Sequence, residues 1–173
     1  MNLLDKLKEG NERYVSHSDA SRRMDTAENG QNPYAIIICC SDSRVIPEHI
    51  FDAALGDLFV IRVAGNVLDN HQLGSIEYAA AHLECKLIVM LGHTGCGAVN
   101  AALSGHTSGY ISYITDDILA AAGLEREPDR ASRLNVLHGV ERIKREFAEH
   151  PEMQDVKAVG AIYDIKSGRV EWL

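Results

Sequence analysis

The sequence lacks any long apolar run, since no hydrophobic stretch approaches the roughly 20 residues needed to cross a bilayer. Its first residues also lack the apolar segment of a secretory signal. No dense block of Lys or Arg is present, and the formal net charge is −8. Nucleic acids and anionic membranes both require a basic surface, so neither partner is expected, whereas a small anion is still possible. The location predicted from these absences is cytoplasmic.

Cysteine is also scarce, with four residues in a chain of 173. In the cytoplasm these cysteines are expected to be reduced, and therefore available to a metal. The length is sufficient for one domain with a single substantial core. We therefore expect residues 1–173 to form one domain.

Apolar runs that end in small and polar residues predict the strands of a mainly parallel central sheet of about four strands. These runs are residues 35–39, 57–62, 86–92 and 156–165. Helical patterns alternate with them: a short one follows Pro47, and longer ones cover residues 70–83, 95–103, 111–122 and 130–148. This alternation predicts an α/β domain whose sheet is flanked by helices. Residues 170–173 are predicted to return as an antiparallel edge strand.

The first 33 residues precede the first core strand and are expected to form an N-terminal arm. Residues 2–15 have a helical spacing of apolar side chains, with Asn2 as a candidate N-cap. Residues 16–33 are polar and are predicted to be a loop. The apolar face of this arm could pack on its own sheet or on a neighbouring subunit, and the pattern does not distinguish the two.

Three candidate metal ligands follow two of the predicted strands. Cys40 comes directly after the run 35–39, and His93 and Cys96 come directly after the run 86–92. Binding crevices in open α/β sheets form at the carboxyl ends of strands. Two thiolates and one imidazole fill three corners of a zinc tetrahedron, and the open fourth corner is typical of catalytic zinc. The alternative is a buried cysteine pair with a hydrogen-bonded histidine.

Asp42 and Arg44 lie on either side of Ser43, so both side chains can turn to the same side of the chain. A guanidinium beside the carboxylate would keep it charged and oriented. Such an aspartate could accept a hydrogen bond from zinc-bound hydroxide, or it could bind zinc itself as the fourth ligand in a closed form. The alternative is an ion pair at a helix entry. The residues together predict attack of metal-activated hydroxide on a small electrophile, but they do not identify that electrophile.

Five motifs resemble those of the β-class carbonic anhydrases, in the same order and with similar spacing. They are residues 40–45 (CSDSRV), 56–62 (GDLFVIR), 64–66 (AGN), 75–79 (SIEYA) and 92–99 (GHTGCGAV). The resemblance covers nearly the whole chain. It implies the zinc-dependent, reversible hydration of carbon dioxide to bicarbonate and a proton. Under this resemblance Cys40, His93 and Cys96 hold Zn²⁺, and Asp42 and Arg44 form the catalytic dyad.

The resemblance also implies substrate-binding residues. Gln31 matches a glutamine that serves the active site across the family's dimer interface. Phe59 and Tyr78 match aromatic positions of the cleft, although ordinary core packing explains their pattern equally well. Gly97 matches a backbone N–H donor that faces the substrate. The family's unit is a homodimer, often paired into tetramers, in which the N-terminal helix packs on the partner.

Some features separate this chain from parts of the family. Ile37 stands where some relatives have a tryptophan that forms an inhibitory bicarbonate pocket. We therefore predict weak or absent inhibition of that kind and an Asp42 that spends more time off the zinc. Two other functions fit the motifs: hydrolysis of carbonyl sulfide or carbon disulfide on the same fold, and non-enzymatic zinc or anion binding. The Asp42–Arg44 pair disfavours the non-enzymatic alternative. Cys39 and Cys85 are expected to be core residues.

Overall fold

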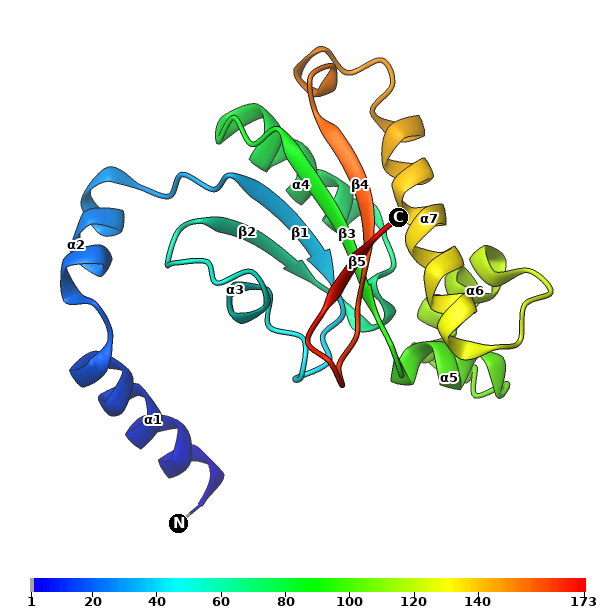
Figure 1. The fold of residues 1–173 in the computed structure, drawn as a ribbon, viewed down its shortest axis with the longest axis horizontal. Coiled ribbons are helices and arrows are strands. Elements are labelled where there is room, and N and C mark those ends of the chain that lie inside the picture. Colours follow the sequence, from blue (N-terminus) through cyan, green and yellow to red (C-terminus); the bar gives the residue numbers. More distant parts are fainter. Residues whose placement is uncertain (1) are drawn as a thin grey trace. The chain divides into compact units, whose positions relative to one another are not determined.

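A computed structural model describes residues 2–173 of the chain (Figure 1). The chain divides into two compact units, with the division between Gln31 and Asn32. The second unit contains the sheet and all of the predicted metal ligands, and the first contains only the N-terminal helices. Of the helices that the structure describes, none is long and apolar enough to cross a membrane.

The second unit is built on one five-stranded sheet with the strand order β2-β1-β3-β4-β5. The strands are β1 (Ala35–Cys39), β2 (Leu58–Arg62), β3 (Leu87–His93), β4 (Lys157–Tyr163) and β5 (Val170–Trp172). The first four strands pair in parallel, and β5 adds to β4 antiparallel. The predicted fold class is confirmed, including the antiparallel edge strand.

Helices cover this sheet because the strands bury side chains on both faces. Around the sheet lie α3 (Pro47–Ile50), α4 (Asn70–His82), α5 (Gly97–Leu103), α6 (Ile111–Ala122), α7 (Pro128–Glu146) and the 3₁₀ turns η1 (Ala64–Asn66) and η2 (Pro151–Met153). Ile36 and Ile38 point to the side packed by α4 and α7, whereas Ile37 and Cys39 point to the opposite side. All four side chains are buried, as a parallel sheet between two layers requires.

Helix α7 packs on the sheet where the strands carry glycine. Val136 of α7 is fully buried and lies over Gly92 of β3 and Gly160 of β4. A Cβ atom at Gly160 would lie 2.8 Å from Cγ1 of Val136, and one at Gly92 would lie 2.6 Å from Cγ2. These distances leave no room for a side chain. The two glycines therefore set how closely α7 approaches the carboxyl end of the sheet.

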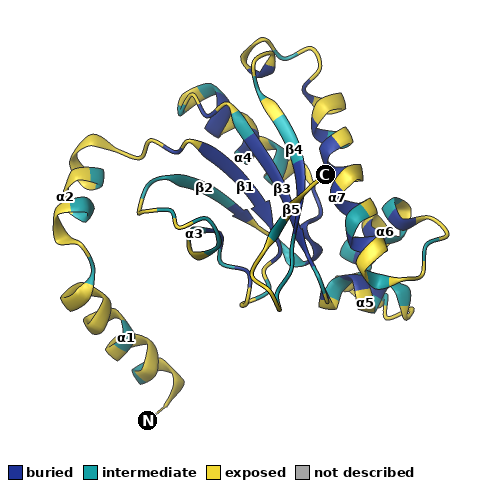
Figure 2. Cartoon of the chain, in the orientation of Figure 1, coloured by how far each residue is buried: buried dark blue, intermediate teal, exposed yellow. Residues whose placement is uncertain are grey.

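The N-terminal unit consists of α1 (Leu3–His17) and α2 (Ala20–Asn29). Helix α1 confirms the predicted first helix, and the Asn2 side chain accepts a hydrogen bond from the N–H of Asp5 at 2.8 Å. The prediction of a loop over residues 16–33 was wrong for most of its length, because Asp19 caps a second helix. Of the residues described in these two helices, none is buried, and Figure 2 colours both helices as exposed or intermediate.

Candidate metal centre

Cys40, His93 and Cys96 meet at the carboxyl ends of two neighbouring strands. Cys40 follows the last residue of β1, His93 is the last residue of β3, and Cys96 is the N-cap of α5. Cys39 is in register with Leu91 in the parallel β1–β3 pair, so both strands deliver their ligands to one edge. One ligand atom from each of the three residues lies within 4.8 Å of the other two, and all three residues are buried. The structure therefore brings together the three residues that the sequence predicted.

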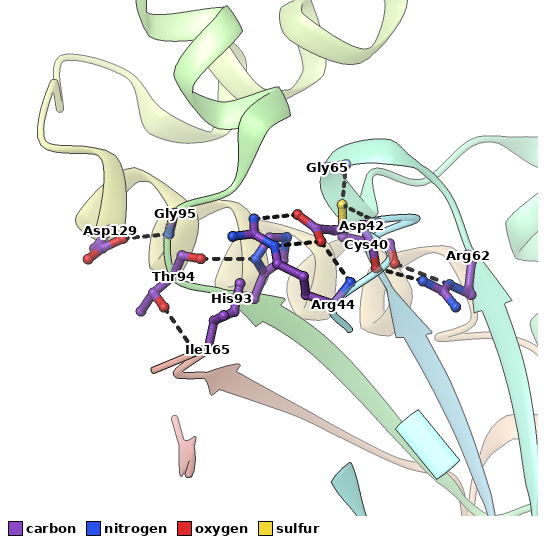
Figure 3. A network of polar contacts seen from close by, with 10 residues as sticks. All are labelled: Cys40, Asp42, Arg44, Arg62, Gly65, His93, Thr94, Gly95, Asp129 and Ile165. Atoms are coloured by element: carbon purple, nitrogen blue, oxygen red, sulfur yellow. Dashed lines mark hydrogen bonds and ion pairs between the residues drawn. The ribbon is translucent and has the colours of Figure 1, made fainter. Parts of the chain in front are cut away.

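The hydrogen bonds of His93 leave one ring nitrogen available. Its Nδ1 lies 3.0 Å from the carbonyl oxygen of Thr94, which can only accept, so Nδ1 carries the proton (Figure 3). The other nitrogen, Nε2, is buried without a hydrogen-bond partner among the described residues. A buried ring nitrogen without a partner is costly. Histidines that bind a metal through Nε2 normally donate from Nδ1 to a carbonyl oxygen or a carboxylate, as His93 does here. This orphaned nitrogen beside two thiols fits zinc, a metal that prefers nitrogen and sulfur ligands.

Backbone N–H groups support the sulfur of Cys40. The N–H of Gly65 donates to Sγ at 3.3 Å, and the N–H of Asp42 donates at 3.4 Å. A hydrogen bond from the Cys96 thiol, together with these donors, lowers the pKa of Cys40 to about 4 despite its burial. The same hydrogen bond, and then burial, raise the pKa of Cys96. A bound dication would favour the deprotonated form of both sulfurs.

Asp42 is held by Arg44 through both carboxylate oxygens. Arg44 Nε donates to Oδ1 at 2.9 Å, Nη2 donates to Oδ2 at 2.7 Å, and the backbone N–H of Arg44 adds a third hydrogen bond at 2.9 Å. These hydrogen bonds hold the pKa of Asp42 well below its usual range. The carboxylate is therefore ionised and oriented beside Cys40, as the spacing of the two residues predicted. Its predicted role as a fourth metal ligand stays a prediction.

Sequence reasoning missed Arg62, which braces the loop between Cys40 and Asp42. Arg62 Nη2 donates to the carbonyl oxygen of Asp42 at 2.8 Å, and Nε donates to that of Cys40 at 3.3 Å. Arg62 is the register partner of Cys39 on the neighbouring strand β2. Because parallel strands deliver their last residues to one edge, the position of Arg62 at the end of an apolar run was a usable signal.

Sequence reasoning also missed two residues of α7, one that contacts the loop between His93 and Cys96 and one that contacts Gly65, the donor to Cys40. Asp129 Oδ1 accepts a hydrogen bond at 3.2 Å from the N–H of Gly95, which lies between His93 and Cys96 (Figure 3). Asn135 Nδ2 donates at 2.8 Å to the carbonyl oxygen of Gly65. Neither residue belongs to a motif near the ligands, so no sequence signal pointed to them.

The predicted substrate-binding residues lie in several places. Phe59 of β2 and Tyr78 of α4 form a tilted aromatic pair with ring centroids 6.3 Å apart. Phe59 packs against the core, whereas Tyr78 is 49% exposed. Gly97 is the first residue of α5, directly after Cys96. Gln31 is exposed and belongs to the N-terminal unit. Their roles towards a substrate stay predictions.

Comparison with protein families matches residues 35–170 to the carbonic anhydrase family. The carbonic anhydrase of Mycolicibacterium smegmatis is 38% identical over 183 aligned positions, covering 95% of this chain and 89% of that protein. Carbonic anhydrase 2 of Mycobacterium tuberculosis is 50% identical over 117 positions, covering 64% of this chain. That match spans only 56% of the tuberculosis protein.

The fold is shared with solved structures. One of them is described as a tetrameric β-carbonic anhydrase from the filamentous ascomycete Sordaria macrospora. It superposes with a TM-score of 0.76 at 28% sequence identity, covering 99% of this chain and 94% of that one.

Proposed function

Because this chain belongs to the β-class carbonic anhydrase family, we propose that it catalyses the reversible hydration of carbon dioxide to bicarbonate and a proton, with zinc as its cofactor. One observation carries the proposal. Cys40, His93 and Cys96 converge within 4.8 Å of one another, beside an aspartate held at both oxygens by an arginine. A purely structural zinc has no need of that charged pair, whereas a hydration reaction does.

Cys40, His93 and Cys96 would hold the zinc, with His93 binding through Nε2. Zinc supplies a water of lowered pKa, and so a nucleophile near neutral pH. The hydrogen bond from His93 Nδ1 to Thr94 fixes the ring, and the N–H groups of Gly65 and Asp42 fix the Cys40 sulfur. The site is thus formed by strand ends whose positions are set by the sheet, and it needs little rearrangement to bind a metal.

Asp42 would orient the oxygen nucleophile, and Arg44 would hold Asp42 in place. The ionised carboxylate accepts a hydrogen bond from that oxygen and so directs its lone pair at the carbon of the substrate. Arg44 keeps the carboxylate charged and, by occupying both of its oxygens, opposes its movement onto the metal. Phe59, Tyr78 and the Gly97 N–H would line the cleft that receives carbon dioxide.

We also propose that the working form is a homodimer or a tetramer of two such dimers, in a cytoplasmic setting. A structurally similar protein is tetrameric, and the two N-terminal helices bury none of their described residues within one chain. In such a dimer the arm would pack on the partner, and Gln31 would reach the partner's cleft. The four free cysteines suit a reducing compartment.

Stopped-flow measurement of carbon dioxide hydration, with zinc content determined on the same sample, tests the proposal. We expect one zinc per chain and hydration that a chelator abolishes. Carbonyl sulfide and carbon disulfide are assayed alongside, because a hydrolase on this fold would consume them and leave carbon dioxide. Zinc-replete oligomer with no hydration activity contradicts the proposed function.

A further inference from the structure

Gly65, whose N–H supports the Cys40 sulfur, is held through its carbonyl by a side chain from a distant helix. The Gly65 N–H donates to Cys40 Sγ at 3.3 Å, and the Gly65 carbonyl accepts from Asn135 Nδ2 at 2.8 Å. Asn135 lies on α7, is only 4% exposed, and is 70 positions away from Gly65 in the sequence. Both polar groups of Gly65 are therefore used, one towards the metal centre and one towards α7.

Gly65 lies inside the 3₁₀ turn η1, but its own backbone conformation is not helical. Gly65 has φ +70° and Asn66 has φ +42°, so two successive residues lie in the left-handed region. A Cβ atom at Gly65 would lie 2.8 Å from Ile118 Cδ1 and 3.1 Å from Ala98 Cβ, so the backbone is also closely packed. A turn of this kind persists only where its surroundings fix it. The Asn135 amide provides the hydrogen bond that fixes the carbonyl.

We propose that Asn135 is a positioning residue for the metal centre, and that it acts through Gly65 to hold the Cys40 thiolate in the direction that binds zinc. The inference rests on the proposed zinc site. Asn135 touches neither metal nor substrate in this role. Its amide fixes the Gly65 carbonyl, the φ/ψ of Gly65 then aims the N–H at Sγ, and the sulfur is pre-oriented before the cation arrives.

The same helix offers a matched control. Ser132 lies one turn before Asn135 and is equally buried at 4% exposed, but its hydroxyl donates within the helix to the Pro128 carbonyl at 3.0 Å. Ser132→Ala therefore removes a buried polar group from α7 without touching Gly65. Asn135→Leu removes the amide while nearly keeping the side-chain size.

Zinc affinity measured by chelator competition, and the thiolate-to-cobalt charge-transfer bands of the Co²⁺-substituted protein, test the inference on folded full-length chain. In Asn135→Leu we expect the zinc Kd to rise about tenfold and the cobalt bands to shift. In Ser132→Ala we expect both to match the wild type, even if both variants unfold at a lower temperature. Should Asn135→Leu not fold, Asn135→Ser, whose side chain is too short for this contact, is expected to give the same rise.

A folded Asn135 variant with wild-type zinc affinity and wild-type cobalt bands overturns the inference and leaves the proposed function intact. A loss of affinity in Ser132→Ala as large as in Asn135→Leu also overturns it, because general damage to α7 would then explain both. A wild-type chain that binds no zinc overturns the proposed metal centre, and the role of Asn135 with it.

Discussion

Asp42 lies beside the candidate metal ligands and is bound to Arg44, so under the proposed function metal binding and catalysis belong to different side chains. Removing the carboxylate should therefore spare the zinc. For Asp42→Ala we expect full zinc content with hydration reduced by roughly 100-fold or more, the usual effect of losing a group that directs proton transfer. Zinc analysis and stopped-flow assay of the same sample measure the two effects. Loss of zinc from this variant would instead make Asp42 chiefly a metal ligand.

Two adjacent cysteines provide a second test of single side chains. Cys40 reaches the metal centre, whereas Cys39 points to the other side of the sheet, where burial raises its pKa to about 12. We expect Cys40→Ala to lose zinc and activity together. Cys39→Ala should keep both, at a stability cost of about 1 kcal/mol for the lost core contacts. Zinc content and thermal unfolding are measured for both variants. Equal zinc loss in Cys39→Ala and Cys40→Ala contradicts the proposal that only Cys40 binds the metal.

The ligands and the Asp42–Arg44 pair could be predicted because each sits within a few residues of a strand end. Strand ends of a parallel sheet meet at one edge, so neighbouring runs imply neighbouring side chains. Asn135 and Asp129 could not be found in this way. Both act from α7, and their contacts depend on how that helix packs on the sheet, which no local pattern in the sequence reports.

Helix α7 packs close to Gly92 of β3 and Gly160 of β4. This close packing lets its side chains reach the candidate site. Gly160→Ala would place a Cβ atom 2.8 Å from Val136 Cγ1. We expect this overpacking to cost about 1–3 kcal/mol in the free energy of unfolding. Adding Val136→Ala should relieve part of that cost, so the double variant is less destabilised than the sum of the single variants.

Denaturant unfolding of the wild type, the two single variants and the double variant measures the coupling free energy between Gly160 and Val136. Gly74→Ala in α4 is the control, since a Cβ atom there meets nothing within 4 Å and alanine favours a helix. We expect Gly74→Ala to be neutral or stabilising. Strict additivity of Gly160→Ala and Val136→Ala would show that the close approach of α7 does not limit this position.

Helix α2 could not be predicted from hydrophobic periodicity. Its sequence has no apolar repeat, and it buries none of its described residues, so the periodicity that identifies most helices is missing. The usable signals were at its ends. Asp19 caps the first turn by accepting from the N–H groups of Ser21 and Arg22, and Gly30 follows the last helical residue with φ +82°.

At the scale of the whole molecule, the N-terminal unit exposes apolar side chains that one chain does not cover. Leu3 is 84% exposed and Leu7 is 73% exposed, one turn apart on α1. Short helices without tertiary packing are marginal in water, so the proposed dimer would stabilise this unit. We expect the variant carrying Leu3→Ser and Leu7→Ser to dissociate at higher protein concentration than the wild type.

Sedimentation velocity over a dilution series measures this dissociation. Lys8→Ser, an exposed change on the same helix, is the control and should sediment as the wild type does. An oligomer that is unaffected by both leucine substitutions contradicts the proposed role of the arm.

The order of elements along the chain has a consequence for folding kinetics. Strands β1 and β3 are neighbours in the sheet, but α3, β2 and α4 lie between them in the sequence. The contact between Cys40 and His93 therefore closes a long loop, and we expect it to form late in folding because its entropic cost is high. We expect zinc to slow unfolding strongly and to change the refolding rate little, as denaturant-jump experiments with and without chelator would measure. An equal effect on both rates contradicts this order. If zinc slows unfolding as expected, the supply of zinc in the cell sets the lifetime of the folded chain.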